Sequence, residues 1–101
     1  MNTEEKILII YIKAVYGEIC GPTNSRILYY RNIHPSRSIL VTIRKHWVYN
    51  NQTEEDVFDK ILSSNYGAGP EPNDKDVLMG CPIPGPTSQR FDWDVIKAVF
   101  V

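Results

Sequence analysis

The sequence predicts an α+β fold, with a mainly helical N-terminal half and a proline- and glycine-rich, partly β C-terminal half. Apolar residues repeat at helical spacing over residues 3–19 and again over 53–63. Five of the seven prolines and four of the six glycines lie in residues 65–90, which therefore cannot be mostly helix. The chain has 101 residues, 43% of them hydrophobic, so we expect a single domain over 1–101 with a core of its own.

The first predicted helix covers residues 3–19. Thr3 stands at the N-cap position, and Glu4 and Glu5 supply the negative charge that a helix N-terminus favours. Gly21, which a proline follows, ends the helix. A buried strand is the competing interpretation, because several residues of this segment are β-branched, namely Ile7, Ile9, Ile10, Ile12 and Val15. Length and capping favour the helix.

Two further helices fit the central stretch of the chain. Thr23 would cap a short helix over 24–31, residues 32–34 would turn, and Pro35 would stand in the first turn of a helix that runs to about Val48. On this second helix the apolar side chains share one face, formed by Ile39, Leu40, Ile43 and Trp47. The opposite face carries mostly cations and small polar groups, namely Arg37, Ser38, Val41, Arg44 and Lys45. A DNA-recognition helix needs such a partition, since one face packs on the protein and the other meets bases and phosphates.

Together with the preceding helix, residues 3–49 resemble the helix-turn-helix DNA-binding superfamily, particularly its winged members. The resemblance is carried by Ser25-Arg26-Ile27 in the positioning helix, Asn32-Ile33 at the turn, and Pro35-Ser36-Arg37-Ser38-Ile39 with Ile43-Arg44 in the recognition helix. It implies that the partner is DNA and that the recognition helix presents to it Arg37, Ser38, Thr42, Arg44 and Lys45. Arg37 would contact a base, and Arg26 and Arg31 would hold phosphate.

A β-hairpin is the alternative for the same stretch. Residues 26–33 would form one strand, 34–37 the turn and 38–49 the returning strand. One face of the returning strand would carry Ile39, Val41, Ile43, Trp47 and Tyr49, and the other Leu40, Thr42, Arg44, His46 and Val48. The stretch is basic and aromatic in either structure, so contact with nucleic acid or an acidic partner does not depend on the choice.

The net charge of -1 conceals an uneven distribution. Residues 19–53 hold five Lys and Arg and no acid, whereas residues 54–101 hold nine acids against four bases. The basic segment indicates a binding face for an anionic partner. The alternative is that both segments are solvated faces that partly pair with each other on folding.

The residue pattern in the second half of the chain predicts one more helix and a long loop. Thr53 and the acids after it open the helix over 53–63, and the loop covers 65–90. Within the loop, only Val77-Leu78-Met79 can form a short strand. The last segment, 91–101, fits a strand or a helix and is expected to dock onto the core or onto another subunit.

The sequence contains no recognisable catalytic or metal-binding pattern. Cys20, His34, His46 and Cys81 match no zinc-ligand spacing, so we expect no enzyme activity, no metal and no cofactor. Two cysteines are too few for a disulfide scaffold and are expected to be reduced thiols. The longest apolar stretch, residues 7–12, is too short to span a bilayer, and the N-terminus is acidic rather than basic. We therefore expect a soluble, cytoplasmic protein.

These observations predict a small DNA-binding regulatory protein that forms a homodimer through residues 65–101. The alternative is a protein-binding inhibitor or adaptor, of the kind that mobile elements encode. In that interpretation the acidic, proline-rich segment 65–101 is the surface that contacts the partner protein.

Overall fold

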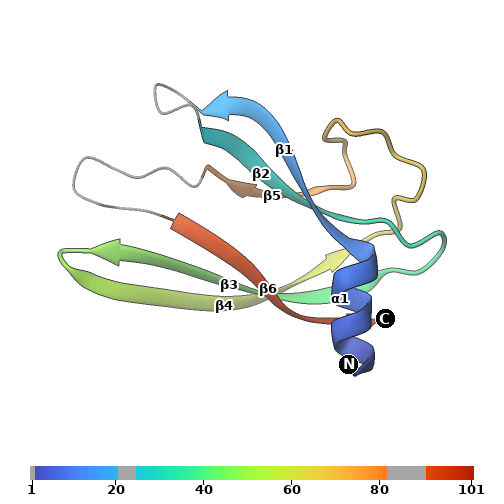
Figure 1. Cartoon of the computed structure of the whole chain (residues 1–101), viewed down its shortest axis with the longest axis horizontal. Coiled ribbons are helices and arrows are strands. Elements are labelled where there is room, and N and C mark those ends of the chain that lie inside the picture. Colours follow the sequence, from blue (N-terminus) through green and yellow to red (C-terminus); the bar gives the residue numbers. More distant parts are fainter. Residues whose placement is uncertain (1, 21–24, 82–90) are drawn as a thin grey trace.

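The computed structural model describes residues 2–20, 25–81 and 91–101, which form one short helix and six strands in two sheets. Sheet A, the upper one in Figure 1, has the strand order β1 (Ile12–Cys20), β2 (Ser25–Asn32), β5 (Val77–Gly80). Sheet B, below it, has the order β4 (Gln52–Leu62), β3 (Ile39–Tyr49), β6 (Phe91–Phe100). Every neighbouring pair is antiparallel. The predicted α+β class is wrong, because strands replace the helical half.

The helix α1 (Thr3–Tyr11) is the part of the first predicted helix that forms. Its N-cap is Asn2 and not Thr3: the Asn2 Oδ1 accepts a hydrogen bond from the Glu5 N–H at 2.8 Å. The chain becomes extended at Ile12 and continues directly as β1. The second half of this segment forms a strand. β-Branched residues favour a strand there, and β1 has β2 as a partner strand with which to pair.

The segments predicted as positioning and recognition helices are the strands β2 and β3. They lie in different sheets and do not pair with each other, so the predicted hairpin is also wrong, although its strand positions are nearly right. The proposed cap at Thr23 and the helix start at Asn24 lie outside the described residues. The helix-turn-helix architecture is therefore absent from the described residues 25–49.

The segment predicted as the last helix, 53–63, is the edge strand β4. Asn50 and Asn51 join β3 to β4 and both have positive φ, at 49° and 63°. This is the backbone of a two-residue type I′ turn, which suits the twist of two paired strands. The eleven register pairs between β3 and β4 that follow override the helical spacing of the apolar residues in β4.

The core lies between the two sheets. Ile39, Val41 and Ile43 on one face of β3 are fully buried, and they pack with Leu28 and Tyr30 of β2. The same cluster contains Ile7 of α1, Leu62 and Ala98. The division into two faces that the hairpin alternative gave this strand is confirmed for Ile39, Val41 and Ile43, whereas the helical face of the recognition helix is wrong. The predicted short strand at 77–79 is also confirmed, as β5, and the last segment is the strand β6.

The segment between β4 and β5, residues 63–76, covers the outer face of sheet A. Arg31 projects from β2 under this segment and forms an ion pair with Asp76 at 2.8 Å. The Arg31 guanidinium also donates to the main-chain carbonyls of Gly69 and Glu71. These bonds give part of the predicted 65–90 loop a fixed path. The rest of that loop, residues 82–90, lies outside the described residues.

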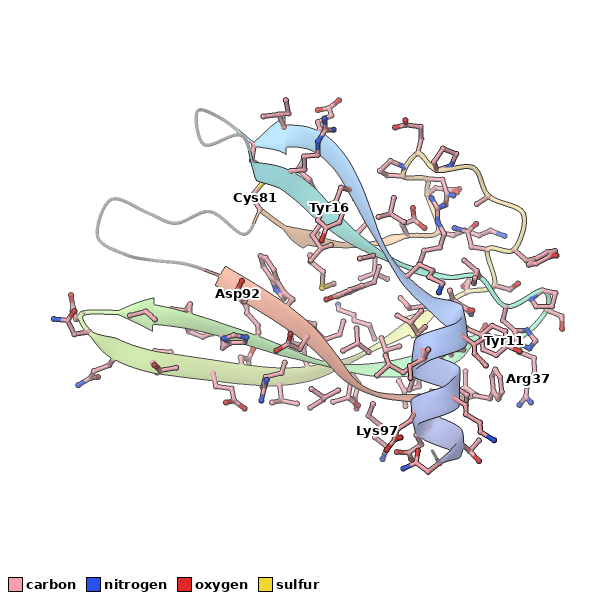
Figure 2. All side chains as sticks on the ribbon, viewed as in Figure 1. Tyr11, Tyr16, Arg37, Cys81, Asp92 and Lys97 are labelled. Carbon is pink, nitrogen blue, oxygen red and sulfur yellow. A yellow bond between two sulfur atoms is a disulfide. The ribbon has the colours of Figure 1, made fainter. Side chains whose placement is uncertain are left out.

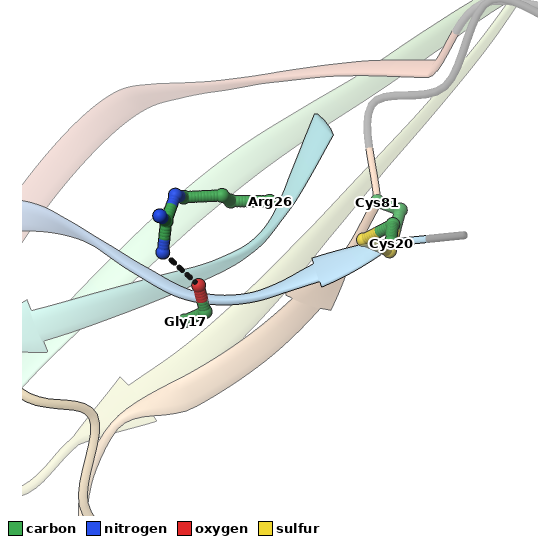
Figure 3. The surroundings of a disulfide bond; sticks show 4 residues. All are labelled: Gly17, Cys20, Arg26 and Cys81. Carbon is green, nitrogen blue, oxygen red and sulfur yellow. Dashed lines mark hydrogen bonds between the residues drawn. A yellow bond between two sulfur atoms is a disulfide. The ribbon is translucent and has the colours of Figure 1, made fainter. Parts of the chain in front are cut away.

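Cys20 and Cys81 form a disulfide, so the prediction of two reduced thiols is wrong. Cys20 ends β1, and Cys81 directly follows β5 (Figure 3). Since β1 and β5 flank β2, the bond ties the two outer strands of sheet A together at one end. No helix among the described residues has the length and apolar character that crossing a membrane requires.

Candidate functional site

Two end strands from different sheets lie on the same side of the molecule. Among the described residues, β1 pairs with β2 alone and β6 pairs with β3 alone, so each has one edge without a partner strand. The helix α1 packs against the C-terminal part of β6, and Glu4 forms an ion pair with Lys97 at 3.8 Å. Both strands run close to α1 (Figure 1), and residues at the start of β1 and near the start of β6 line a common groove.

That space is a groove of about 330 Å³. Its lining is largely apolar and comes from α1, from both sheets and from the first residues of β1, namely Leu8, Ile9, Ile12, Ala14, Tyr30, Trp93, Asp94 and Val95. Beyond the groove, Tyr16 is 56% exposed on the side of β1 that faces β6 (Figure 2). Ile19, on the same face after a bulge, is 54% exposed. An exposed apolar surface of this kind marks an interaction site.

The free edge of β1 presents main-chain hydrogen-bonding groups. The Ile33 N–H donates to the Tyr11 carbonyl at 2.9 Å, and this pair continues the β1–β2 register. Bonded residues alternate along an antiparallel pair, so the main-chain groups of Ala14 and Tyr16 and the Ile12 carbonyl point away from β2, whereas the Ile12 N–H donates to the Leu8 carbonyl. The side chains of these same three residues face the groove. An added strand could therefore bond to the edge and fill the groove at once.

Asp94 brings negative charge to the rim of the groove. Its carboxylate accepts from Arg44 at 2.9 Å and lies 3.2 Å from the His46 ring nitrogen. The hydrogen bond from Arg44 is the main reason that the pKa of Asp94 is lowered, and burial opposes the effect only in part. The side chain of Asp94 remains 48% exposed, so the carboxylate is accessible.

Tyr30 forms the floor of the groove between the two sheets. Its hydroxyl donates to the Trp93 carbonyl at 2.9 Å, which links sheet A to β6. Burial, and then the nearby Asp94 and Tyr16, raise the pKa of Tyr30 from 10.0 to about 12. The groove therefore disfavours an additional negative charge.

We expect Tyr30 to make the protein less stable in alkali. The unfolded chain loses the tyrosine proton near pH 10, whereas the folded chain keeps it to about pH 12, so the free energy of unfolding falls as the pH rises between these values. Tyr30→Phe should cost about 1 kcal/mol at neutral pH and remove this part of the alkaline loss. Urea unfolding at neutral and alkaline pH measures both effects, with Tyr29→Phe as the control. Equal alkaline losses in wild type and Tyr30→Phe would contradict the assignment.

The residues predicted to bind nucleic acid do not form one surface. Arg26 is exposed in β2 and donates to the Gly17 carbonyl at 3.0 Å, whereas Arg31 is buried on Asp76. Arg37 stacks on the Phe100 ring at 4.2 Å, close to Tyr11 (Figure 2).

The remaining four predicted residues lie in β3 or just before it. The Ser38 carbonyl accepts from the Val101 N–H. Thr42 and Arg44 are on the outer face of sheet B, bonded to Asp59 and Asp94, whereas Lys45 alternates to the inner face. The recognition helix that would have gathered these seven residues is not formed, and DNA binding stays a prediction.

Comparison with known proteins gives no match: the chain fits no family model and resembles no curated protein and no solved structure. The fold and the groove therefore have to be interpreted from their own chemistry.

A metal-binding cluster or the second groove of the sandwich could also have formed a site. Among the described residues, no group of three or more His, Cys, Asp and Glu side chains could hold a metal ion. The opposite opening of the sandwich, between β4 and β5, has mixed charge, with Lys45, Lys60, Asp56 and Asp59 around Phe58 and Met79. Neither offers the combination of a free edge and an apolar groove found at β1.

The sequence contained two signals for the groove. Ile12, Ala14 and Tyr16 would share one face of an extended chain, but the apolar Val15 interrupts the alternation, and the helical interpretation of 3–19 conceals the strand. Phe91, Trp93 and Val95 alternate as in a strand, which is one of the two structures that fit the last segment. That both strands would border one groove depends on how the two sheets pack, which no local pattern contains.

Proposed function

We propose that the protein is a binding module, an adaptor or inhibitor, that captures an extended segment of a partner protein at the groove between β1 and β6. The partner segment would add to sheet A as a strand beside β1. This proposal keeps the predicted protein-binding role but moves the contact surface, because Gly69, Glu71 and Asp76 are bonded to Arg31 of sheet A and, among the described residues of the acidic half, those that line the groove belong to β6.

One observation carries the proposal: the main-chain groups of Ala14 and Tyr16, together with the Ile12 carbonyl, point outward from the edge whose side chains line or border the groove. Main-chain bonds to an edge strand supply affinity for any extended peptide, and the alternate side chains supply specificity. An open edge is otherwise a liability in a protein, because it invites pairing with other chains.

The disulfide bears on the cellular compartment in which this binding takes place. Disulfides persist in oxidising compartments and are rare in the cytosol. The bond between Cys20 and Cys81 therefore favours an oxidising compartment over the predicted cytoplasmic location.

Selection from a random linear peptide library displayed on phage, with the full chain as the target, tests the proposed function. The decisive variant is Ala14→Pro. A proline at this position removes an N–H that points to the free edge and leaves the bonds to β2 intact. We expect selected peptides to bind the wild type and to lose at least about tenfold in affinity for Ala14→Pro.

Ala14→Ser is the matched control, since it keeps the N–H and should bind as the wild type does. Thermal unfolding of both variants checks that they fold. A library that yields no binder, or peptides that bind Ala14→Pro unchanged, would overturn the proposal. A wild-type dimer that Ala14→Pro dissociates would assign the edge to a second copy of the chain instead.

A further inference from the structure

A residue of the added strand that stands opposite Ala14 would point its side chain toward the centre of the groove. Ala14 is directly opposite Tyr30 in the β1–β2 register, and the Tyr30 hydroxyl bonds to the main chain at Trp93. Ala14 is small, so a long side chain on an added strand has room beside it. That side chain would extend across the groove toward the neighbouring lining residues Trp93, Asp94 and Val95.

The charge at this place is negative. Among the described residues, Asp94 is the one charged side chain that lines the groove. Arg44 and His46 contact this carboxylate from sheet B, at 2.9 Å and 3.2 Å, and balance part of its charge. The Asp94 carboxylate is about half exposed and can accept a second donor.

The remaining lining supports a cation and its apolar stem. Tyr30 and Trp93 are aromatic, and the faces of such rings attract ammonium and guanidinium groups. Ile12 and Val95 offer apolar surface against which the methylene groups of a long side chain can pack. A carboxylate, two aromatic residues and an apolar wall are together complementary to lysine or arginine.

We propose that the captured segment carries a lysine or arginine at the position facing Ala14, with apolar residues at the two alternate positions that face Ile12 and Tyr16. This inference rests on the proposed strand capture and specifies its ligand. The sequence class is an extended segment with the pattern apolar, any residue, basic, any residue, apolar.

Three synthetic peptides that differ at one position test the specificity. Each has the core Val-Thr-X-Thr-Val, with X lysine, methionine or glutamate, and binding to the full chain is measured by fluorescence anisotropy. We expect the lysine peptide to bind about fivefold more tightly than the methionine peptide, and the glutamate peptide to bind most weakly.

Two variants of the protein separate a direct contact from a structural role of Asp94. Asp94→Asn should reduce the preference for lysine over methionine to about twofold or less, because the ring contacts remain. Arg44→Gln removes the competing cation and should increase the preference, whereas a purely structural ion pair would make both variants weaker binders of all peptides. Asp59→Asn, a charge-matched change on β4, should leave the preference unchanged.

The outcomes distinguish this inference from the proposed function. Binding of the lysine and methionine peptides with equal affinity, or an unchanged preference in Asp94→Asn, would overturn the inference and leave strand capture standing. If none of the three peptides binds and the library also yields no binder, strand capture itself fails.

Discussion

Loss of the disulfide between Cys20 and Cys81 is expected to lower the free energy of unfolding by about 4 kcal/mol. The two cysteines are 61 residues apart in the sequence, so the bond closes a long loop and restricts the unfolded chain strongly. Small domains have a total stability of about 5 to 15 kcal/mol, so this loss removes a large fraction of it. Urea unfolding of the wild type, with and without a reductant, measures the effect.

The double variant Cys20→Ser with Cys81→Ser provides the control for the reductant. It should unfold at the same urea concentration as the reduced wild type and show no response to the reductant. A difference of less than about 1 kcal/mol between oxidised and reduced wild type would contradict the expected role. The bond also holds the end of β1, so peptide binding at the groove should weaken together with stability.

The local pattern of β3 contained its two faces, but only the hairpin alternative used it, and the favoured recognition helix was wrong. Ile39, Val41 and Ile43 have to be buried on one side, and period-two alternation records this directly. The same reasoning located Val77-Leu78-Met79 between turn residues. Such predictions hold where burial on one face dominates the choice of residues.

The error at 53–63 has the opposite cause. β4 is an edge strand whose side chains are mostly exposed, so its sequence records little about its neighbours. The acids and the spacing of Val57, Phe58, Ile61 and Leu62 favour a helix locally, and only pairing with β3 decides otherwise. The better signal was Asn50-Asn51, since asparagine tolerates the positive φ that a two-residue hairpin turn needs.

The charge count of residues 19–53 was correct, but these residues do not form one basic surface. Four of the five bases of residues 19–53 are divided between the two sheets, and the fifth, Arg37, lies in the connection between β2 and β3. Arg31 is buried and Arg44 is paired, so acids from the C-terminal half neutralise part of the basic segment. Segment charge becomes a binding face only when one element presents it, as the predicted recognition helix would have done.

Breaking the ion pair between Arg31 and Asp76 is expected to cost about 3 to 5 kcal/mol. The two side chains are 5% and 0% exposed, so removal of either one leaves a buried charge without its partner. Asp76→Ala also removes the acceptor for Asn65 and for the Asn73 N–H. Urea unfolding of Asp76→Ala at neutral pH measures the loss, and Asp74→Ala, an exposed neighbour, should cost less than about 0.5 kcal/mol.

The Asp76 carboxylate also makes the free energy of unfolding depend on pH in the acidic range. Burial alone would raise the pKa of Asp76, but the hydrogen bonds from Arg31, the Asn73 N–H and Asn65 outweigh it and lower the pKa below 3.8. A group whose folded pKa is lowered stabilises the protein above its unfolded pKa and loses that contribution as the pH falls through the folded value. The wild type should therefore lose stability as the pH drops through 3.8 and below, and Asp76→Asn should lose less over the same range.

A double variant shows whether the cost comes from the unpaired charge or from the lost path of residues 63–76. Arg31→Met with Asp76→Leu removes both charges and should recover part of the stability that Asp76→Ala loses. Full recovery is not expected, because the carbonyls of Gly69 and Glu71 would lose the guanidinium that holds them over sheet A. If the double variant is no more stable than Asp76→Ala, the charge is not the dominant cost, and the main-chain bonds to residues 63–76 fix this side of the sheet.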